Sequence, residues 1–271
     1  MASCAVFGGS DPRAEVSSAV FALTPAESKR LIAKGVANLP EVKAALQKGR
    51  VVIATGSTTG YVAEEILGRQ FERKKFLSGH IFDGLLCAMG DHPALYPFVI
   101  IDGQVIDVPP EDILPDFEAT DVFIKSANAV DINGHAGVLM ANELGGTIGM
   151  ALGILTSRGA NLIVPVGMEK MIPSVTEASR RLGTRRVKYG LESAALEGKI
   201  GLMPLVTATV ITEVTALHRL CDVEVFHIAS GGIGGSEGSV VLLIEGKEEN
   251  VQSALSLIKE IKGEPPFGRP Y

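Results

Sequence analysis

The stretch VVIATGSTTG at residues 51–60, followed by YVAEEIL at residues 61–67, predicts the fold more directly than any other part of this chain. An apolar run breaks into glycine, serine and threonine and then continues as a helical sequence, which is the order of a buried strand, a tight turn and a helix start. The free N–H groups of a first helical turn attract anions. The alternative is that Ser57 or Thr58 only caps the helix. The expected anion site, most simply for a phosphate, consists of Thr55, Gly56, Ser57, Thr58 and Thr59.

The composition is that of a chain with a large apolar core and a net negative charge. It has 271 residues, 46% of them hydrophobic, and a formal net charge of -6. This charge disfavours binding to nucleic acid or to an anionic membrane surface, so we expect a small-molecule partner. Cys4, Cys87 and Cys221 form no zinc or redox motif, and the N-terminus does not resemble a targeting segment, which favours the cytoplasm. No metal or other cofactor is expected, because the histidines show no ligand spacing.

The segment 136–155 is almost free of charge, but we interpret it as buried and not as membrane-spanning. Glu143 lies in its middle, where a carboxylate is costly inside a bilayer, and several glycines weaken a spanning helix. The expected structure is a glycine-rich turn with Gly145 and Gly146, leading into a core helix.

Strand and helix signals alternate along the first 205 residues. Asp102-Gly103 is a strong hairpin signal between two apolar segments. The alternation favours an α/β fold with a mainly parallel sheet covered by helices on both faces. Residues 206–271 differ in character and predict a small α+β module or extension. The expected domains are therefore 1–205, for ligand binding, and 206–271.

Ligands of parallel sheets bind at the carboxyl ends of the strands. Three expected strands end in polar segments, at residues 55–58, 126–131 and 167–170. If these strands are parallel, their ends converge on one cleft, to which Asn128 and Lys170 would contribute together with the glycine-rich turn.

Two of these segments resemble a known superfamily. ATGSTT at residues 54–59 is similar to the phosphate loop of ribose-5-phosphate isomerase, and ANAVD at residues 127–131, followed by Asn133 and a glycine-rich run, resembles its second signature. Glucosamine-6-phosphate deaminase and the CoA transferases share that fold. A weaker likeness, at KMIP in residues 170–173, is to the domain of lactate-utilisation proteins. The resemblance covers residues 25–180 and implies an isomerase- or CoA-transferase-like fold. We also expect a homo-oligomer.

The chain departs from the isomerase at the catalytic positions. The isomerase has an acidic pair where this chain has Asn128-Ala129, and it uses a lysine shortly downstream, whereas no lysine lies between Lys125 and Lys170 here. The isomerase mechanism is therefore not carried over to this chain.

Two carboxylates remain as candidate catalytic groups, Asp131 and Glu143. Glu143, if buried without a partner, would have a raised pKa that suits a general base or a nucleophile, and CoA transferases of this fold use a glutamate in the second way. The alternative is a structural carboxylate that accepts N–H bonds at a helix start.

The sequence thus leaves two functions open. One is an enzyme of the isomerase, deaminase or CoA-transferase type that acts on a phosphorylated or CoA-linked metabolite. The other is a non-catalytic ligand-binding or regulatory protein of the same fold.

Three further features have two interpretations each. His135 is either a solvated turn residue or a proton shuttle. The basic residues between Arg180 and Lys188 form either a solvated face or a cluster that holds a phosphate tail or an acidic partner surface. The glycine-rich loop Gly231 to Gly238 is either a mobile hairpin loop or one that wraps a ligand or lines a subunit interface.

Overall fold

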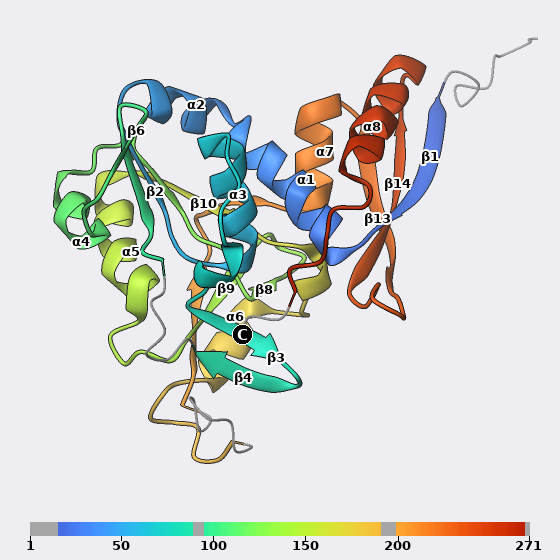
Figure 1. Cartoon of the computed structure of the whole chain (residues 1–271). Coiled ribbons are helices and arrows are strands. Elements are labelled where there is room, and N and C mark those ends of the chain that lie inside the picture. Colours follow the sequence, from blue (N-terminus) through green and yellow to red (C-terminus); the bar gives the residue numbers. More distant parts are fainter. Residues whose placement is uncertain (1–15, 89–94, 191–198, 269–271) are drawn as a thin grey trace, which may run out of the picture.

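A six-stranded sheet forms the centre of the computed structural model, which describes residues 16–88, 95–190 and 199–268 (Figure 1). Four neighbouring strands are parallel, and the last two are antiparallel to their neighbours. The α/β class and a mostly parallel sheet are therefore as expected, while the likeness to the isomerase fold stays a prediction. The strand order is β12 (Thr209–Ile211), β10 (Asn161–Pro165), β7 (Val122–Ile124), β2 (Arg50–Ile53), β5 (Phe98–Ile101) and β6 (Gln104–Ile106).

Each face of this sheet contributes to a separate apolar cluster, because successive side chains of a strand point to opposite faces. Val51 and Ile53 of β2 pack with helices α1 (Pro25–Ala37) and α3 (Ser57–Leu67). Val52 of β2 packs with helix α5 (Gly146–Arg158). Figure 1 shows α3 and α5 on opposite sides of the sheet.

Two local features follow directly from the sequence. Thr24 caps α1, with its hydroxyl accepting the Glu27 N–H at 3.4 Å and the Glu27 carboxylate accepting the Thr24 N–H at 2.9 Å. The β5–β6 hairpin turns at Asp102 and Gly103, whose φ values are 48° and 77°. The expected hairpin is confirmed, and its positive φ values explain why aspartate and glycine occupy the turn.

A second sheet combines the start and the end of the chain. β1 (Ser17–Leu23) pairs with β14 (Ser239–Gly246), which pairs with β13 (Glu224–Gly231). Helices α7 (Glu213–Cys221) and α8 (Glu248–Ile261) contribute to the apolar cluster beneath it. Two strands thus cross the expected boundary at residue 206: β1 joins the sheet of the C-terminal residues, and β12 joins the main sheet. The division into two domains stays a prediction.

The remaining elements are short. Among the described residues, no helix combines the length and the apolar character needed to cross a membrane. Cys4 lies outside the described residues. The elements are β11 (Gly201–Leu205), β9 (Ala136–Met140) and β8 (Ala129–Val130) in one sheet, the hairpin β3 (Gly79–Phe82) and β4 (Leu85–Ala88), the helices α2 (Pro40–Gln47), α4 (Pro110–Ile113) and α6 (Val175–Arg181), and the 3-10 turns η2 (Arg73–Lys75), η3 (Leu114–Asp116) and η4 (Met168–Lys170). Of these, the hairpin β3–β4, the small sheet β8, β9 and β11, and η4 lie near the carboxyl ends of the parallel strands.

Candidate functional site

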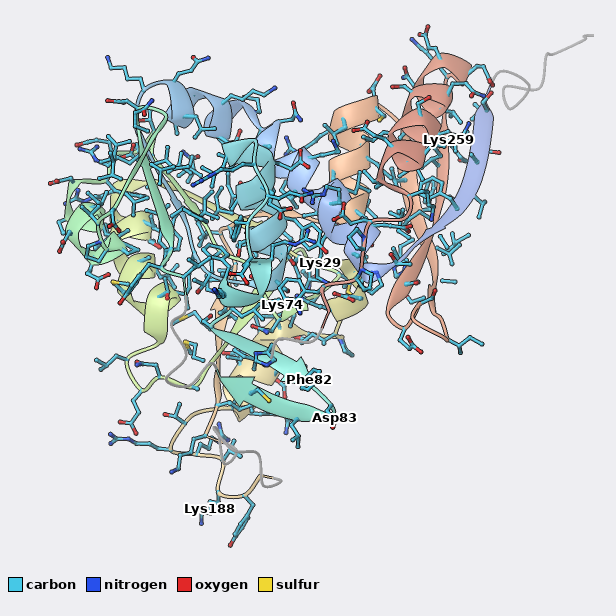
Figure 2. All side chains as sticks on the ribbon, in the orientation of Figure 1. Lys29, Lys74, Phe82, Asp83, Lys188 and Lys259 are labelled. Atoms are coloured by element: carbon cyan, nitrogen blue, oxygen red, sulfur yellow. The ribbon has the colours of Figure 1, made fainter. Side chains whose placement is uncertain are left out.

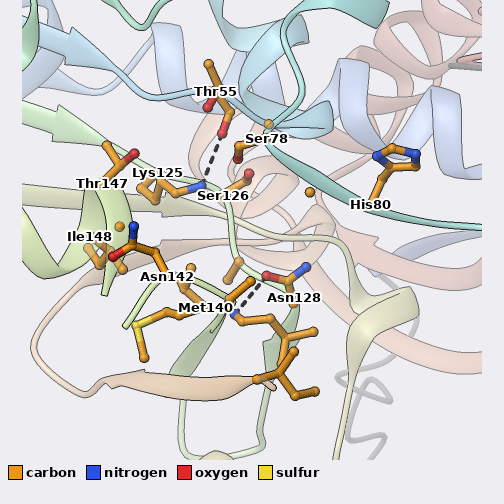
Figure 3. Close-up of a pocket in the computed structure, with 18 of the residues that line it drawn as sticks. Thr55, Ser78, His80, Lys125, Ser126, Asn128, Met140, Asn142, Thr147 and Ile148 are labelled. Atoms are coloured by element: carbon orange, nitrogen blue, oxygen red, sulfur yellow. Dashed lines mark hydrogen bonds between the residues drawn. The ribbon is translucent and has the colours of Figure 1, made fainter. Parts of the chain in front are cut away.

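A cavity of about 300 Å³ lies where the segments that follow β2, β7 and β10 meet (Figure 3). The three strand ends expected to converge therefore do so. The start of α5 and the hairpin β3–β4 complete the cavity wall. The lining includes seven of the predicted ligand residues, which are Thr55, Gly56, Ser57, Asn128, Gly145, Gly146 and Lys170.

The first wall of the cavity is the turn that joins β2 to α3. Gly56 passes so close to the segment after β7 that a Cβ atom there would lie 2.2 Å from the Ser126 Oγ atom, so a side chain at this position requires the Ser126 hydroxyl to move. The first hydrogen bond of α3 joins the Gly60 N–H to the Gly56 carbonyl at 2.9 Å. The backbone N–H groups of Ser57 to Thr59 therefore precede the helical hydrogen bonds, and a site of this kind favours an anion.

The hydroxyl groups in this turn differ from the expectation. Thr58 is fully buried, does not line the cavity, and its Oγ1 atom has no hydrogen-bond partner among the described residues. Thr59 also lies outside the lining, and its hydroxyl donates to the Gly56 carbonyl at 3.1 Å. Gly56 is the N-cap residue and no side chain caps the helix, so the interpretation of Ser57 or Thr58 as a cap is wrong. Of these three hydroxyl residues, only Ser57 lines the cavity.

The second wall is the start of α5. Its N-cap residue, Gly145, has a φ of 85° and Gly146 has a φ of 57°, and this left-handed conformation favours glycine. The first helical hydrogen bond joins Gly149 N–H to the Gly145 carbonyl at 3.0 Å. Gly146 and Thr147 line the cavity, and their N–H groups precede this first helical bond. Two helix N-termini thus border the same cavity, and both favour negative charge.

Two lysines add positive charge to the cavity. The Lys125 Nζ atom donates to the Thr55 carbonyl at 3.1 Å, and the Lys170 Nζ atom donates to the Ala127 carbonyl at 3.0 Å (Figure 3 shows the first bond). Burial lowers the pKa of each lysine to about 8, and the charge of Lys170 lowers that of Lys125 further. Neither lysine forms an ion pair with a described carboxylate, and none of the described lining residues is Asp or Glu. The lining therefore has a net positive charge when both lysines are protonated.

Ser126 and Asn128 supply neutral polar groups. Ser126 is 8% exposed, and its hydroxyl makes no hydrogen bond with the described residues. The Asn128 side-chain oxygen accepts the Leu139 N–H at 3.0 Å, which leaves the amide N–H groups for a ligand.

The hairpin β3–β4 forms the outer part of the cavity wall and contributes His80, Ile81, Leu86 and Cys87 to the lining. Figure 2 places Phe82 and Asp83 at its tip. Burial lowers the pKa of His80, so this ring is neutral at physiological pH.

Asp131 lies outside the cavity and has a structural role. It is 2% exposed, and its carboxylate accepts N–H bonds from Asn133 at 3.0 Å, His135 at 3.1 Å and Val175 at 2.9 Å. Burial alone would raise the pKa of Asp131, but these hydrogen bonds hold it below the ordinary value. The carboxylate therefore fixes the turn before β9 and the start of α6, and its position does not support the catalytic role expected for it.

Glu143 is exposed and also lies outside the cavity. Its side chain is 60% exposed and pairs with Arg185 at 2.8 Å, so it is not the expected buried carboxylate without a partner. The predicted role as a buried base or nucleophile is therefore not supported by its position. The basic residues around Arg185 also lie outside the lining, and Figure 2 shows Lys188 far from the sheet. His135 lies with its Nδ1 atom 3.5 Å from Asp131 Oδ2 and does not line the cavity.

Sequence reasoning missed Lys125, Asn142 and Thr147 as site residues, and it placed Ser126 at the cleft only as the first residue of the polar segment 126–131. The signal at Lys125 was a single charged residue directly after the apolar residues Val122 to Ile124, since a lysine that ends a buried strand lies at the ligand-binding edge of a parallel sheet.

The chain was compared with protein-family models, curated proteins and solved structures. No family model, curated protein or solved structure matches the chain. The resemblance to the isomerase, deaminase and CoA-transferase superfamily therefore stays a prediction, as does the homo-oligomer. Within the described ranges, no group of three or more His, Cys, Asp or Glu side chains is arranged to hold a metal ion.

Proposed function

We propose that the cavity binds a small phosphorylated metabolite, with its anionic group between the N-termini of α3 and α5 and the two lysines. The observation that supports this most strongly is that Lys125 and Lys170 both line the cavity while no described lining residue is acidic. A buried ammonium group without a counter-ion is unfavourable, and a bound anion would compensate both charges.

The volume of the cavity restricts the size of the ligand. About 300 Å³ is at the lower end of the range for small-molecule sites. A sugar phosphate or a compound of similar size suits this volume, whereas a CoA-linked ligand would place only its acyl end inside. The site therefore favours the phosphorylated class over the CoA-linked class.

Two functions are compatible with such a ligand. An enzyme of the isomerase, deaminase or transferase type would use Lys125 and Lys170 for proton transfer, since a pKa of about 8 suits exchange near neutral pH. A non-catalytic binding or regulatory protein is the second candidate, and the exclusion of Asp131 and Glu143 from the cavity favours it. Binding is common to both.

A thermal-shift screen tests the binding proposal, because a ligand that binds only the folded state raises the melting temperature by mass action. The ligands are inorganic phosphate, ribose 5-phosphate, glucosamine 6-phosphate and a CoA thioester, with free ribose as the uncharged control. We expect the phosphorylated sugars to raise the melting temperature and free ribose to leave it unchanged.

Matched lysine variants test the location. Lys170→Met removes a charge from the cavity and should abolish the shift, whereas Lys74→Met, at an exposed lysine outside the lining, should retain it. The absence of a shift with every anion would overturn the proposal, and an equal loss in both variants would place the site elsewhere.

A further inference from the structure

We propose that Lys125 is a nucleophile that forms an imine with an aldehyde or ketone carbon of the phosphorylated ligand, an inference that rests on the proposed function and narrows its substrate class. The class is a small phosphorylated carbonyl compound, such as an open-chain sugar phosphate.

The placement of Lys125 suits a nucleophile. It directly follows β7, is 8% exposed and lines the cavity, and the Thr55 carbonyl holds its Nζ atom at 3.1 Å. This hydrogen bond needs only one N–H group of the amine, so a neutral amine keeps its lone pair for attack. The backbone carbonyl thus orients the nitrogen without supplying the negative charge that would keep it protonated.

The surroundings favour the neutral amine. The other titratable groups in the lining are Lys170 from η4, His80 from β3 and Cys87 from β4, and no described carboxylate is among them. Burial and the charge of Lys170 lower the pKa of Lys125 to about 8. Lys170 has a similar pKa of about 8, which burial and the Lys29 charge lower and Glu169 and Glu213 raise. We assign the phosphate to Lys170 because Lys125 is the lysine adjacent in sequence to the Ser126 hydroxyl. A lysine that is desolvated and next to another cation is a known arrangement for nucleophilic amines.

Ser126 supplies a donor for the carbonyl oxygen. Ser126 is 8% exposed and lines the cavity, and its hydroxyl has no hydrogen-bond partner among the described residues. In the reaction, the Nζ lone pair forms a bond to the carbonyl carbon, and the C–O bond then breaks. The two protons of the neutral amine leave with the oxygen as water, so no oxidant, reductant or further reactant is required.

Reductive trapping tests this inference on the full chain. The probe is glycolaldehyde phosphate at pH 7 with cyanoborohydride, which reduces an imine to a stable secondary amine, and peptide mapping by mass spectrometry locates the adduct. Exposed Lys259 is the internal reference. A pKa of about 8 in place of the ordinary 10.5 makes the neutral fraction at pH 7 about 300-fold larger, so we expect at least about tenfold more labelling at Lys125 than at Lys259.

Two controls separate binding from chemistry. Glycolaldehyde without the phosphate should show a much smaller preference for Lys125, and excess inorganic phosphate should suppress the labelling. Lys125→Arg removes the nucleophilic amine, so the adduct should disappear from position 125 without appearing on Lys170. Ser126→Ala should slow the labelling of Lys125.

The outcomes distinguish this inference from the proposed function. A thermal shift with inorganic phosphate, combined with labelling of Lys125 no faster than of Lys259 or concentrated on Lys170, overturns the imine and leaves the anion site in place. The absence of both the shift and the labelling overturns both. Because the mapping uses the unsubstituted chain, the test does not depend on the folding of any variant.

Discussion

At Gly56 the chain between β2 and α3 approaches the end of β7 too closely for a side chain. A Cβ atom would lie 2.2 Å from Ser126 Oγ and 2.9 Å from Thr59 Oγ1. Gly56→Ala should therefore lower the free energy of unfolding by about 1–3 kcal/mol through overpacking. It should also weaken phosphate binding, because the Ser126 hydroxyl at the cavity or the start of α3 must shift. Urea denaturation and calorimetric titration measure the two effects.

Gly60→Ala is the matched control in the same helix. The nearest atom to its added Cβ would be Arg73 Cγ at 3.5 Å, an ordinary contact. We expect this variant to raise the free energy of unfolding by up to about 1 kcal/mol, because alanine favours the helix, and to bind phosphate normally. Equal stability losses in the two variants would contradict the close-approach argument.

Asp131→Asn should reduce stability without reducing phosphate binding. Three backbone N–H groups donate to the carboxylate, so the neutral amide should lower the free energy of unfolding by about 1–3 kcal/mol at pH 7. The pKa of Asp131 is lower in the folded chain than in the unfolded chain. The ionised Asp131 therefore stabilises the fold fully above the unfolded pKa of about 4. This stabilisation is lost as the pH falls through the lower pKa that Asp131 has in the folded chain.

Urea denaturation of the Asp131→Asn variant and the unsubstituted chain between pH 7 and pH 3 provides the test. The difference between the two should shrink as the pH falls. A pH-independent difference would contradict the structural role of the carboxylate, and a loss of phosphate binding at unchanged stability would return Asp131 to the ligand site.

Individual residues show how far the sequence could predict the site. Gly56, Ser57 and Lys170 could be placed because they follow expected strands, and parallel strand ends meet at one edge of a sheet. The position of Glu143 could not be predicted, since its exposure depends on the path of a turn and its ion pair joins it to Arg185, 42 residues later in the chain.

At the scale of elements, a network of charges joins α1, α3 and the residues after α8. Arg30 of α1 contacts Glu64 at 2.6 Å, Glu65 at 2.9 Å and Glu264 at 2.9 Å. Glu64 is 6% exposed, so the loss of Arg30 leaves a buried charge with less compensation. Arg30→Met should therefore lower the free energy of unfolding by about 3 kcal/mol.

The neighbouring Lys34→Met variant is the control for this network. Lys34 pairs with Glu260, whose side chain is 64% exposed, at 3.0 Å, so its loss should change the free energy of unfolding by less than about 1 kcal/mol. Urea denaturation compares the two variants, and similar small losses would show that the buried network does not stabilise the packing of α1 on α3.

Elements with local signals were predictable, and pairings between distant segments were not. The capping box at Thr24 and the turn at Asp102-Gly103 are encoded within four residues, and the structure confirms both. The pairing of β1 with β14 brings Ser17 opposite Gly246. No local pattern specifies that register, because it results from the packing of both strands against α1 and α8.

The molecule as a whole has a formal net charge of -6, whereas its cavity is lined by two lysines and by no described acidic residue. Lys125 and Lys170 have folded pKa values of about 8, below the ordinary 10.5. In the free protein these groups lower stability below pH 8, and stability should rise between pH 8 and 10.5, where the unfolded chain binds more protons. The affinity for an anion should instead fall as the pH rises, because the anion requires protonated lysines.

The affinity for sulfate, whose charge is constant in this range, should therefore fall as the pH rises through about 8. Above pH 8, the sulfate affinity should fall by up to about tenfold per pH unit for each lysine that must be protonated to bind the anion. Calorimetric titration between pH 6.5 and 9.5 measures this slope, and Lys125→Met should reduce it. A constant affinity across this window would show that neither lysine holds the anion.

The proposed anion site lies between the two helix N-termini and the two lysines. A crystal structure with tungstate, a phosphate analogue that scatters anomalously, locates the anion directly. We predict an anomalous peak within hydrogen-bond distance of the Ser57 N–H group and of Lys125 or Lys170. A peak only at the basic residues around Arg185, or no peak in the cavity at concentrations that raise the melting temperature, would contradict this proposal.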